Sequence, residues 1–208
     1  MLSSFEPNYP IPRRIETRRL VLRQFDPKDA EEYYTLEQDG LKQHMADFMP
    51  GTSNIGSLED GVREMREKIR TTLDRWEHDA EYRFLIREKG NDTIIGQIGI
   101  TNAIRNVAQS AFIGYWIGNN WLNKGYATEA TAALLNFAFE NLRLHRISIW
   151  IAPENAASLR IVEKLQLWFE GTALRSRYQG GKWADTHIFA ITSEEWIERN
   201  HEIQAFYN

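Results

Sequence analysis

The sequence contains no cysteine, which excludes disulfide bonds, thiol catalysis and thiolate metal sites. No run approaches the roughly 20 apolar residues that a membrane-spanning helix needs, and the opening MLSSFEPNYPIPRR lacks the apolar region of a signal peptide. An excess of positive charge is also absent, because the net charge is -4, which argues against a dedicated nucleic-acid-binding protein. These absences predict a cytoplasmic protein without a membrane or direct nucleic-acid partner.

The composition is that of a folded domain. Apolar residues make up 42 % of the 208-residue chain and charged residues 26 %, so it can build a core and stay soluble. No internal repeat or long linker divides it. We therefore expect a single domain over residues 1–208, with its core at about 17–196, a short N-terminal arm and a C-terminal helix. A cluster of arginines near the start alternates with leucines, as in a strand, and is interpreted as surface charge: Arg13, Arg14, Arg18, Arg19 and Arg23.

The order of secondary-structure elements follows from periodicity and turn signals. A strand at 19–25 precedes two helices, the first capped by Asp26 with Pro27, the second by Ser57. The remaining expected segments are strands at 82–88, 93–100 and 110–118, a helix at 128–142, a strand at 146–152, a helix at 156–165, strands at 167–176 and 183–191, and a short helix after Thr192. This order predicts a mixed α/β (α+β) fold with one mostly antiparallel sheet of about seven strands and helices on its faces.

The stretch NKGYATEA, Asn123 to Ala130, stands between a strand and a helix. A helix start has unpaired backbone N–H groups and a partial positive charge, so it can bind an anion. Gly125 would let a phosphate approach the backbone, and Lys124 could add a charge. The same residues would equally suit an ordinary loop and helix. Nucleotide-binding fingerprints are missing from the chain, so the spacing alone leaves both interpretations open.

A second element follows in IAPENAASLRIVEKLQLWFEG, where Asn155 precedes a helix that contains Ser158. By itself Asn155 is a good N-cap and Ser158 an ordinary residue of the first turns. Together, the two stretches resemble the GCN5-related N-acetyltransferase (GNAT) superfamily, and more closely its ribosomal-protein alanine/serine N-acetyltransferase (RimJ/RimL) branch. The likeness also includes ETRRLVLRQF and YQGGKWADTHIFA, and it extends from Thr17 to Trp196.

The resemblance implies a sheet splayed in its middle and acetyl-CoA as co-substrate. It implies that the loop and helix start hold the pyrophosphate, that the preceding strand end pairs with the pantetheine arm, that Asn155 hydrogen-bonds the pantetheine and that Ser158 lies near the sulfur. The implied loop and strand residues are Tyr115, Trp116, Ile117, Asn123, Lys124, Gly125, Tyr126, Ala127 and Thr128.

The chain departs from the family at three positions. Leu122 stands where Gln or Arg is usual, Trp150 where many relatives have a glutamate base, and Val162 where many have a tyrosine acid. The usual acid–base pair is therefore not recognisable. An α-amine, with a pKa of about 7.7–8.0 against about 10.4 for lysine, loses its proton easily enough to need only a weak base.

Candidate catalytic groups are chosen from what remains. Ser158 is the first choice for returning a proton to the sulfur and Tyr178 the second. For the base the candidates are Asp185, the first choice, and His187, which share a strand face and could equally be a structural polar pair; Glu88, at the end of a strand, is a weaker candidate. The other histidines have no ligand spacing, and we expect no metal.

The predicted activity is acetyl transfer from acetyl-CoA to a primary amine, by direct attack through a tetrahedral intermediate. A protein N-terminus, most simply that of a ribosomal protein, is the acceptor that the resemblance implies. A free amino acid, a polyamine or an amine-bearing antibiotic are alternatives, as is a non-catalytic acyl-CoA-binding module. A homodimer is left open.

Overall fold

The computed structural model describes residues 6–40 and 57–199 and contains an eight-stranded sheet. The strands are β1 (Arg14–Glu16), β2 (Leu20–Gln24), β3 (Tyr82–Glu88), β4 (Ile94–Ile104), β5 (Ser110–Ile117), β6 (Arg146–Ile151), β7 (Trp168–Gln179) and β8 (Lys182–Thr192). Their order in the sheet is β1-β2-β3-β4-β5-β6-β8-β7, and every neighbouring pair is antiparallel except β5 and β6. The mostly antiparallel α/β sheet expected from the sequence is confirmed, with the short β1 as an eighth strand.

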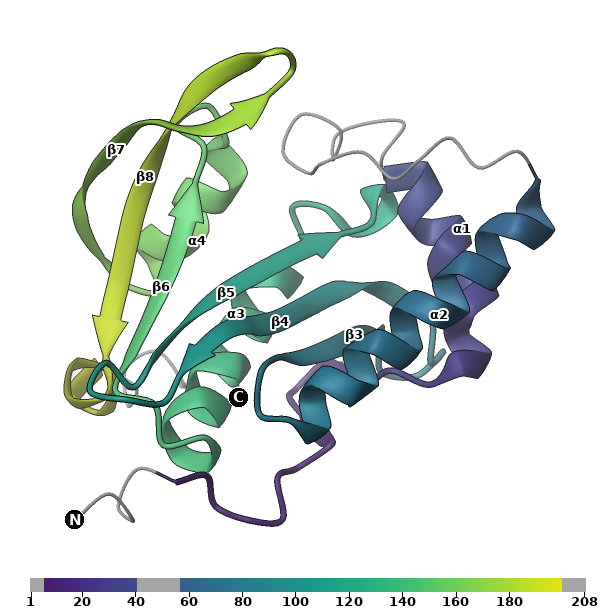
Figure 1. The fold of residues 1–208 in the computed structure, drawn as a ribbon, viewed down its shortest axis with the longest axis horizontal. Coiled ribbons are helices and arrows are strands. Elements are labelled where there is room, and N and C mark those ends of the chain that lie inside the picture. The colour runs from purple at the N-terminus through teal and green to yellow at the C-terminus, as the bar shows by residue number, and fades with distance from the viewer. Residues whose placement is uncertain (1–5, 41–56, 200–208) are drawn as a thin grey trace.

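Helices cover both faces of the sheet (Figure 1). They are η2 (Pro27–Asp29), α1 (Ala30–Gly40), α2 (Leu58–Glu77), η4 (Asn119–Trp121), α3 (Tyr126–Asn136), η5 (Phe137–Asn141) and α4 (Ala156–Lys164). The predicted caps are present, because the side chain of Asp26 accepts from Lys28 N and that of Ser57 from Asp60 N. The helix expected to run evenly to Leu142 instead changes to a π-helical segment at Phe137.

The predicted terminal segments are only partly described. Residues 193–199 are helical, as expected after Thr192. Residues 1–5 of the arm and 200–208 at the other end lie outside the described residues. Within the described ranges, no helix is both long and apolar enough to cross a membrane.

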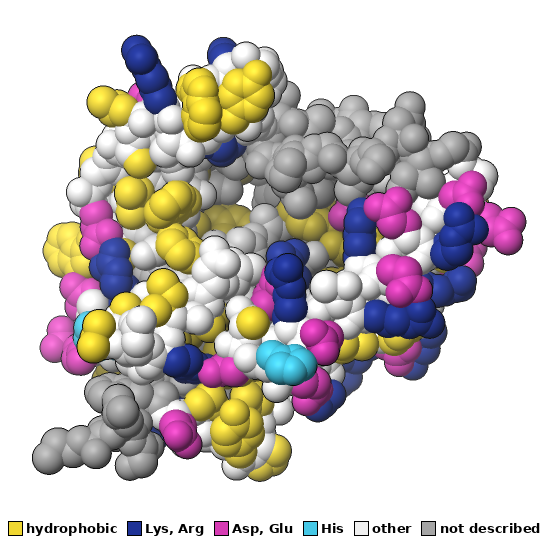
Figure 2. Space-filling model, viewed as in Figure 1, with side chains coloured by type: hydrophobic (Ala, Val, Ile, Leu, Met, Phe, Trp, Pro, Cys, Tyr) yellow, Lys and Arg dark blue, Asp and Glu magenta, His cyan; other side chains and the backbone are white. Residues whose placement is uncertain are grey.

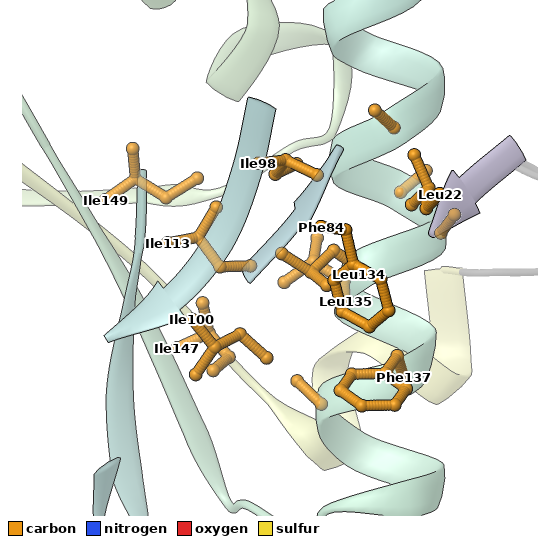
Figure 3. Packing of buried hydrophobic residues seen from close by; sticks show 14 of the residues in the cluster. Leu22, Phe84, Ile98, Ile100, Ile113, Leu134, Leu135, Phe137, Ile147 and Ile149 are labelled. Carbon is orange, nitrogen blue, oxygen red and sulfur yellow. The ribbon is translucent and has the colours of Figure 1, made fainter. Parts of the chain in front are cut away.

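Two apolar clusters hold the helices to the sheet. The larger packs α3 and η5 against the strands through side chains such as Phe84, Ile98, Leu134 and Phe137, all almost fully buried (Figure 3). The smaller joins α1 and α2 to the opposite face and includes Trp116 of β5. Because apolar surface is buried on both faces, the sheet is a rigid support for the loops and side chains at the ends of its strands.

The sheet opens between β5 and β6. These parallel strands pair only from Ser110 to Phe112 on β5 and from Arg146 to Ser148 on β6. Beyond this point the strands diverge, and the later residues of β5 have no strand partner on that side (Figure 1). The predicted splay is therefore present, and it leaves backbone groups of β5 available to another partner.

Candidate active site

The loop after β5 ends in an exposed start of helix α3. Gly125 is the N-cap residue, and its backbone is left-handed with φ +80°, a conformation that glycine adopts without steric cost. No side chain caps the helix there, so the first-turn N–H groups are not satisfied by a capping side chain. This end of α3 has the donors and the partial positive charge that bind an anion.

An ion pair fastens this loop to the strand β2. Glu129, in the first turn of α3, is buried, and its carboxylate accepts from Arg19 Nε at 2.7 Å, Arg19 N at 2.9 Å and Thr17 Oγ1 at 2.6 Å. Arg19 Nη1 also donates to Lys124 O at 2.9 Å, and the guanidinium lies 4.7 Å from the centre of the Tyr126 ring. The interpretation of Arg19 as simple surface charge is therefore wrong, because it holds the loop.

A second arginine of that cluster is also structural. Arg23 Nη2 donates to both carboxylate oxygens of the buried Asp29 at 2.8 Å. The periodicity predicted the strand correctly, but it carries no information on charge partners, and that of Arg19 lies 110 positions along the chain.

A cavity of about 660 Å³ lies between this loop, the end of β5 and the start of α4. Ten of the eleven predicted acetyl-CoA-binding residues line it, and only Lys124 does not: Tyr115, Trp116, Ile117, Asn123, Gly125, Tyr126, Ala127, Thr128, Asn155 and Ser158. Arg160 and Lys164 of α4 also line it and were missed by the sequence analysis. Their i,i+4 spacing puts both cations on one helix face, which was the available signal.

A second cavity, of about 360 Å³, lies on the face of the sheet that carries α1 and α2. Figure 2 shows the hollow at the centre of this face. Gly99 and Gly114 form a cross-strand pair in its lining, and a Cβ added at Gly114 would meet no atom within 4 Å. The missing side chain at Gly114 therefore keeps part of this cavity open.

The two cavities meet at the splay. Tyr115, Trp116, Asn155 and Ser158 line both of them. Asn155 caps α4, because its Oδ1 accepts from Ser158 N at 3.1 Å. A group in one cavity can thus reach a group in the other past these four side chains.

Two hydroxyl groups lie at this junction. The Tyr115 hydroxyl is buried and makes no hydrogen bond within the described residues. Burial raises the pKa of Tyr115 to about 12, and the nearby Ser158 hydroxyl opposes this shift. The phenol is therefore protonated at neutral pH and can donate a proton. Only the backbone of Tyr115 was expected to take part, since nothing local in the sequence indicates where this side chain ends.

The other predicted catalytic residues lie elsewhere, on the β7–β8 hairpin. Tyr178 is 64 % exposed and packs edge-on against Trp183, with ring centres 5.4 Å apart. Asp185 Oδ1 accepts from Arg175 N at 2.8 Å, and His187 Nδ1 lies 2.9 Å from Thr172 Oγ1. Neither Tyr178 nor Asp185 lines either cavity. A direct part of either in proton transfer stays a prediction.

Two of the residues at which the chain departs from the family pattern were expected positions for the base and the acid. Trp150 lines the second cavity and is half exposed, whereas Val162 is buried. Neither can carry a proton. Among the described residues that line the second cavity, none is Asp, Glu or His. The described lining of this cavity therefore offers no carboxylate or imidazole as a base.

Comparison with known proteins gives consistent results. The family model described as an acetyltransferase (GNAT) domain matches residues 19–167. The probable N-acetyltransferase YjcK of Bacillus subtilis is 32 % identical over 87 % of this chain and 98 % of its own. The [ribosomal protein uS5]-alanine N-acetyltransferase of Escherichia coli is 25 % identical over 88 % of this chain and 92 % of its own. The structure of Mycobacterium smegmatis RimJ in complex with CoA-disulfide has the same fold, with a TM-score of 0.81 at 24 % identity over 94 % of this chain and 97 % of that one.

Proposed function

The chain belongs to the GNAT family of acetyltransferases, and from this membership we propose that it acetylates the N-terminal α-amine of a protein, in the simplest case a ribosomal protein. It is an N-acetyltransferase that uses acetyl-CoA as its co-substrate. We further propose that residues 1–208 act as one acetyltransferase domain. The single observation that carries the proposal is the meeting of two cavities at the splay between β5 and β6.

The larger cavity is proposed as the acetyl-CoA site. The N–H groups at the start of α3 would hold the pyrophosphate, with Lys124, Arg160 and Lys164 as nearby cations. The unpaired edge of β5 from Tyr115 to Ile117 would pair with the amides of the pantetheine arm, in the way a strand accepts an added strand. The co-substrate supplies the activated acyl carbon, and Asn155 with Ser158 would position it at the junction.

The acceptor is argued from the lining of the smaller cavity. That lining has two arginines, Arg83 and Arg177, and no carboxylate among its described residues, so it disfavours polycations such as polyamines and aminoglycosides. A cavity without an evident base suits an α-amine, which at pH 7 is neutral roughly a few hundred times more often than a lysine side chain. The relative named for alanine acetylation supports this choice, since the only amine of alanine is its α-amine.

Proton return is proposed to come from the two hydroxyls at the junction. Amide formation breaks the bond between the acyl carbon and sulfur and releases a thiolate, which takes up one proton. Ser158, as predicted, or Tyr115 would donate that proton and regain one from water, and water would take up the proton that the amine loses. In the uncharged lining of the junction, backbone N–H groups of β5 would stabilise the oxyanion.

The test is a free-thiol release assay with acetyl-CoA and a matched acceptor set. The set contains a hexapeptide with a free N-terminal alanine, the same peptide with its N-terminus blocked and one lysine added, spermidine, free amino acids and an aminoglycoside. We expect release with the free-N-terminal peptide and little with the others. Release with spermidine or the aminoglycoside alone would refute the protein acceptor, and acetyl-CoA binding without any release would favour the non-catalytic module.

A further inference from the structure

Arg177 of β7 lines the smaller cavity, which is the proposed acceptor site and is called the acceptor cavity from here on. The guanidinium of Arg177 is only partly paired. Its Nε and Nη2 atoms are buried, and neither has a hydrogen-bond partner among residues 6–40 and 57–199. The ion partner of Arg177 is Glu154, at 3.5 Å between Nη2 and Oε1, and that carboxylate is mostly exposed. A buried donor without a partner is costly, and a guanidinium forms its best hydrogen bonds with a planar anion. The side chain is therefore prepared for a group that enters the cavity.

A distortion of the hairpin directs Arg177 into this position. Ala173 pairs with Thr186 and Arg177 with Ala184, so three residues of β7 lie opposite one of β8. Arg175, within this bulge, has a left-handed backbone with φ +49°, and its N–H donates to Asp185 Oδ1 at 2.8 Å. Bulges bend a strand and redirect its side chains, often beside functional sites. Asp185 thus has a clear use as the residue that holds the bulge.

Glu154 does not line the acceptor cavity, and the charged residues in the described lining of that cavity are all positive. Arg83 is the other charged residue in the described lining, and its Nε donates to Glu81, which also accepts from Arg75 Nη1 at 2.9 Å. No described residue of the lining carries a negative charge. The field in the cavity therefore favours an anion and disfavours a second cation.

We propose that Arg177 binds a carboxylate of the acceptor, close to the reacting α-amine. This inference rests on the proposed function and specifies its substrate: a peptide with an acidic residue in its first positions, or a short acceptor whose own C-terminal carboxylate lies there. A guanidinium and a carboxylate can form two parallel hydrogen bonds, which would fix the orientation of the acceptor. The same positive charge lowers the pKa of a nearby ammonium group, so it would also help the amine to lose its proton.

The experiment compares peptides that differ by one charge. Hexapeptides with the same N-terminal alanine carry Asp or Asn at position 2 or 3, each with a free or amidated C-terminus, and dipeptides are prepared in the same two forms. The wild type is compared with Arg177→Gln, Arg177→Lys and, as a control for the loss of a surface cation, Arg63→Gln on the exposed face of α2. Thiol release gives kcat/KM for each pair, and calorimetry gives the affinity for acetyl-CoA.

We expect the wild type and Arg63→Gln to prefer the acidic acceptor by about 10- to 100-fold, the range for a hydrogen-bonded charge. Arg177→Gln should reduce this ratio to about one, Arg177→Lys should retain part of it, and acetyl-CoA affinity should not change. A preference for Asp identifies a side-chain carboxylate, and a preference for free over amidated dipeptides identifies a C-terminal one. Equal rates for all pairs in the wild type, or a preference that survives in Arg177→Gln, would overturn the inference. No release with any peptide would instead refute the proposed function.

Two variants of Asp185 separate positioning from catalysis. Asp185→Asn keeps an oxygen acceptor for Arg175 N but cannot act as a base, whereas Asp185→Ala loses both. If Asp185 positions Arg177, Asp185→Asn should keep the charge preference and Asp185→Ala should lose it. If Asp185→Asn abolishes turnover of charged and neutral peptides alike, Asp185 is the base and its positioning role is refuted.

Discussion

Gly114 offers a substitution that should make the protein more stable and less active. The glycine lies within β5, opposite Gly99, and contributes to the acceptor cavity. A Cβ there meets nothing within 4 Å, and the φ of Gly114 is not in the left-handed range, so Gly114→Val causes neither a Cβ clash nor backbone strain. Valine has a higher preference for strands than glycine, and the gain is up to about 1 kcal/mol. For a chain of this length that corresponds to a rise in Tm of about 2–4 °C.

The substitution should lower kcat/KM for the acceptor without changing the affinity for acetyl-CoA. The three added carbon atoms occupy space in a cavity of about 360 Å³, beside the path of the incoming amine. A mismatch of this kind in a specificity pocket is worth about 1–3 kcal/mol, or about 10- to 200-fold in kcat/KM. Gly114 does not line the larger cavity, so acetyl-CoA affinity should remain at the wild-type value.

Gly99→Val is the matched control. It adds the same side chain to the lining of the same cavity, but it should lower the free energy of unfolding instead of raising it. A Cβ at Gly99 would lie 2.7 Å from Arg83 Cγ and 3.2 Å from Arg83 Cα, so β3 must move. Overpacking of this type typically costs about 1–3 kcal/mol. Calorimetry measures Tm and acetyl-CoA affinity, and thiol release measures the acceptor kcat/KM. Our assignment of the cavities is refuted if Gly114→Val leaves the acceptor reaction unchanged or weakens acetyl-CoA binding instead.

Local patterns predicted most of the fold, and the family resemblance supplied ten of the residues that line the larger cavity. A strand, a glycine and a helix that follow one another in the chain are also neighbours in space, so the position of NKGYATEA at the start of a helix after a strand could be predicted from its own residues. The caps at Asp26 and Ser57 are likewise local, and both are present. The short β1 was missed because three residues give no periodicity to recognise.

Contacts between distant residues could not be predicted in this way. Glu129 and Arg19 lie 110 positions apart, and only the packing of α3 against β2 brings them together. Arg177 enters the cavity because of a bulge that depends on Asp185 of the neighbouring strand. The Tyr115 hydroxyl owes its environment to the divergence of β5 from β6, which lies beyond any sequence window. The smaller cavity is built from such contacts, and this explains why Tyr178 and Asp185 do not line a cavity whereas most of the predicted loop residues do.

The remaining predictions concern the loop, the junction and one buried carboxyl group. Gly125→Ala should weaken acetyl-CoA binding by about tenfold through about 1–2 kcal/mol of left-handed strain, and Gly125→Glu should weaken it further by charge; equal affinities by calorimetry would remove the anion site. Ser158→Ala and Tyr115→Phe should each lower kcat, by up to about 10²-fold for the true proton donor, and an unchanged rate excludes that hydroxyl. Glu37 is buried, its Oε2 has no hydrogen-bond partner in the described part of the chain, and burial raises the pKa of its carboxyl above the ordinary 4.5. A raised pKa means that the folded state holds this proton more tightly, so the contribution of Glu37 to stability is complete below pH 4.5 and is lost as pH rises through the folded-state value. Glu37→Gln, which never ionises, should therefore exceed the wild type in free energy of unfolding by about 1 kcal/mol at pH 8, with a smaller difference at pH 4; urea unfolding at both values measures it, and a difference that does not shrink at pH 4 contradicts the argument.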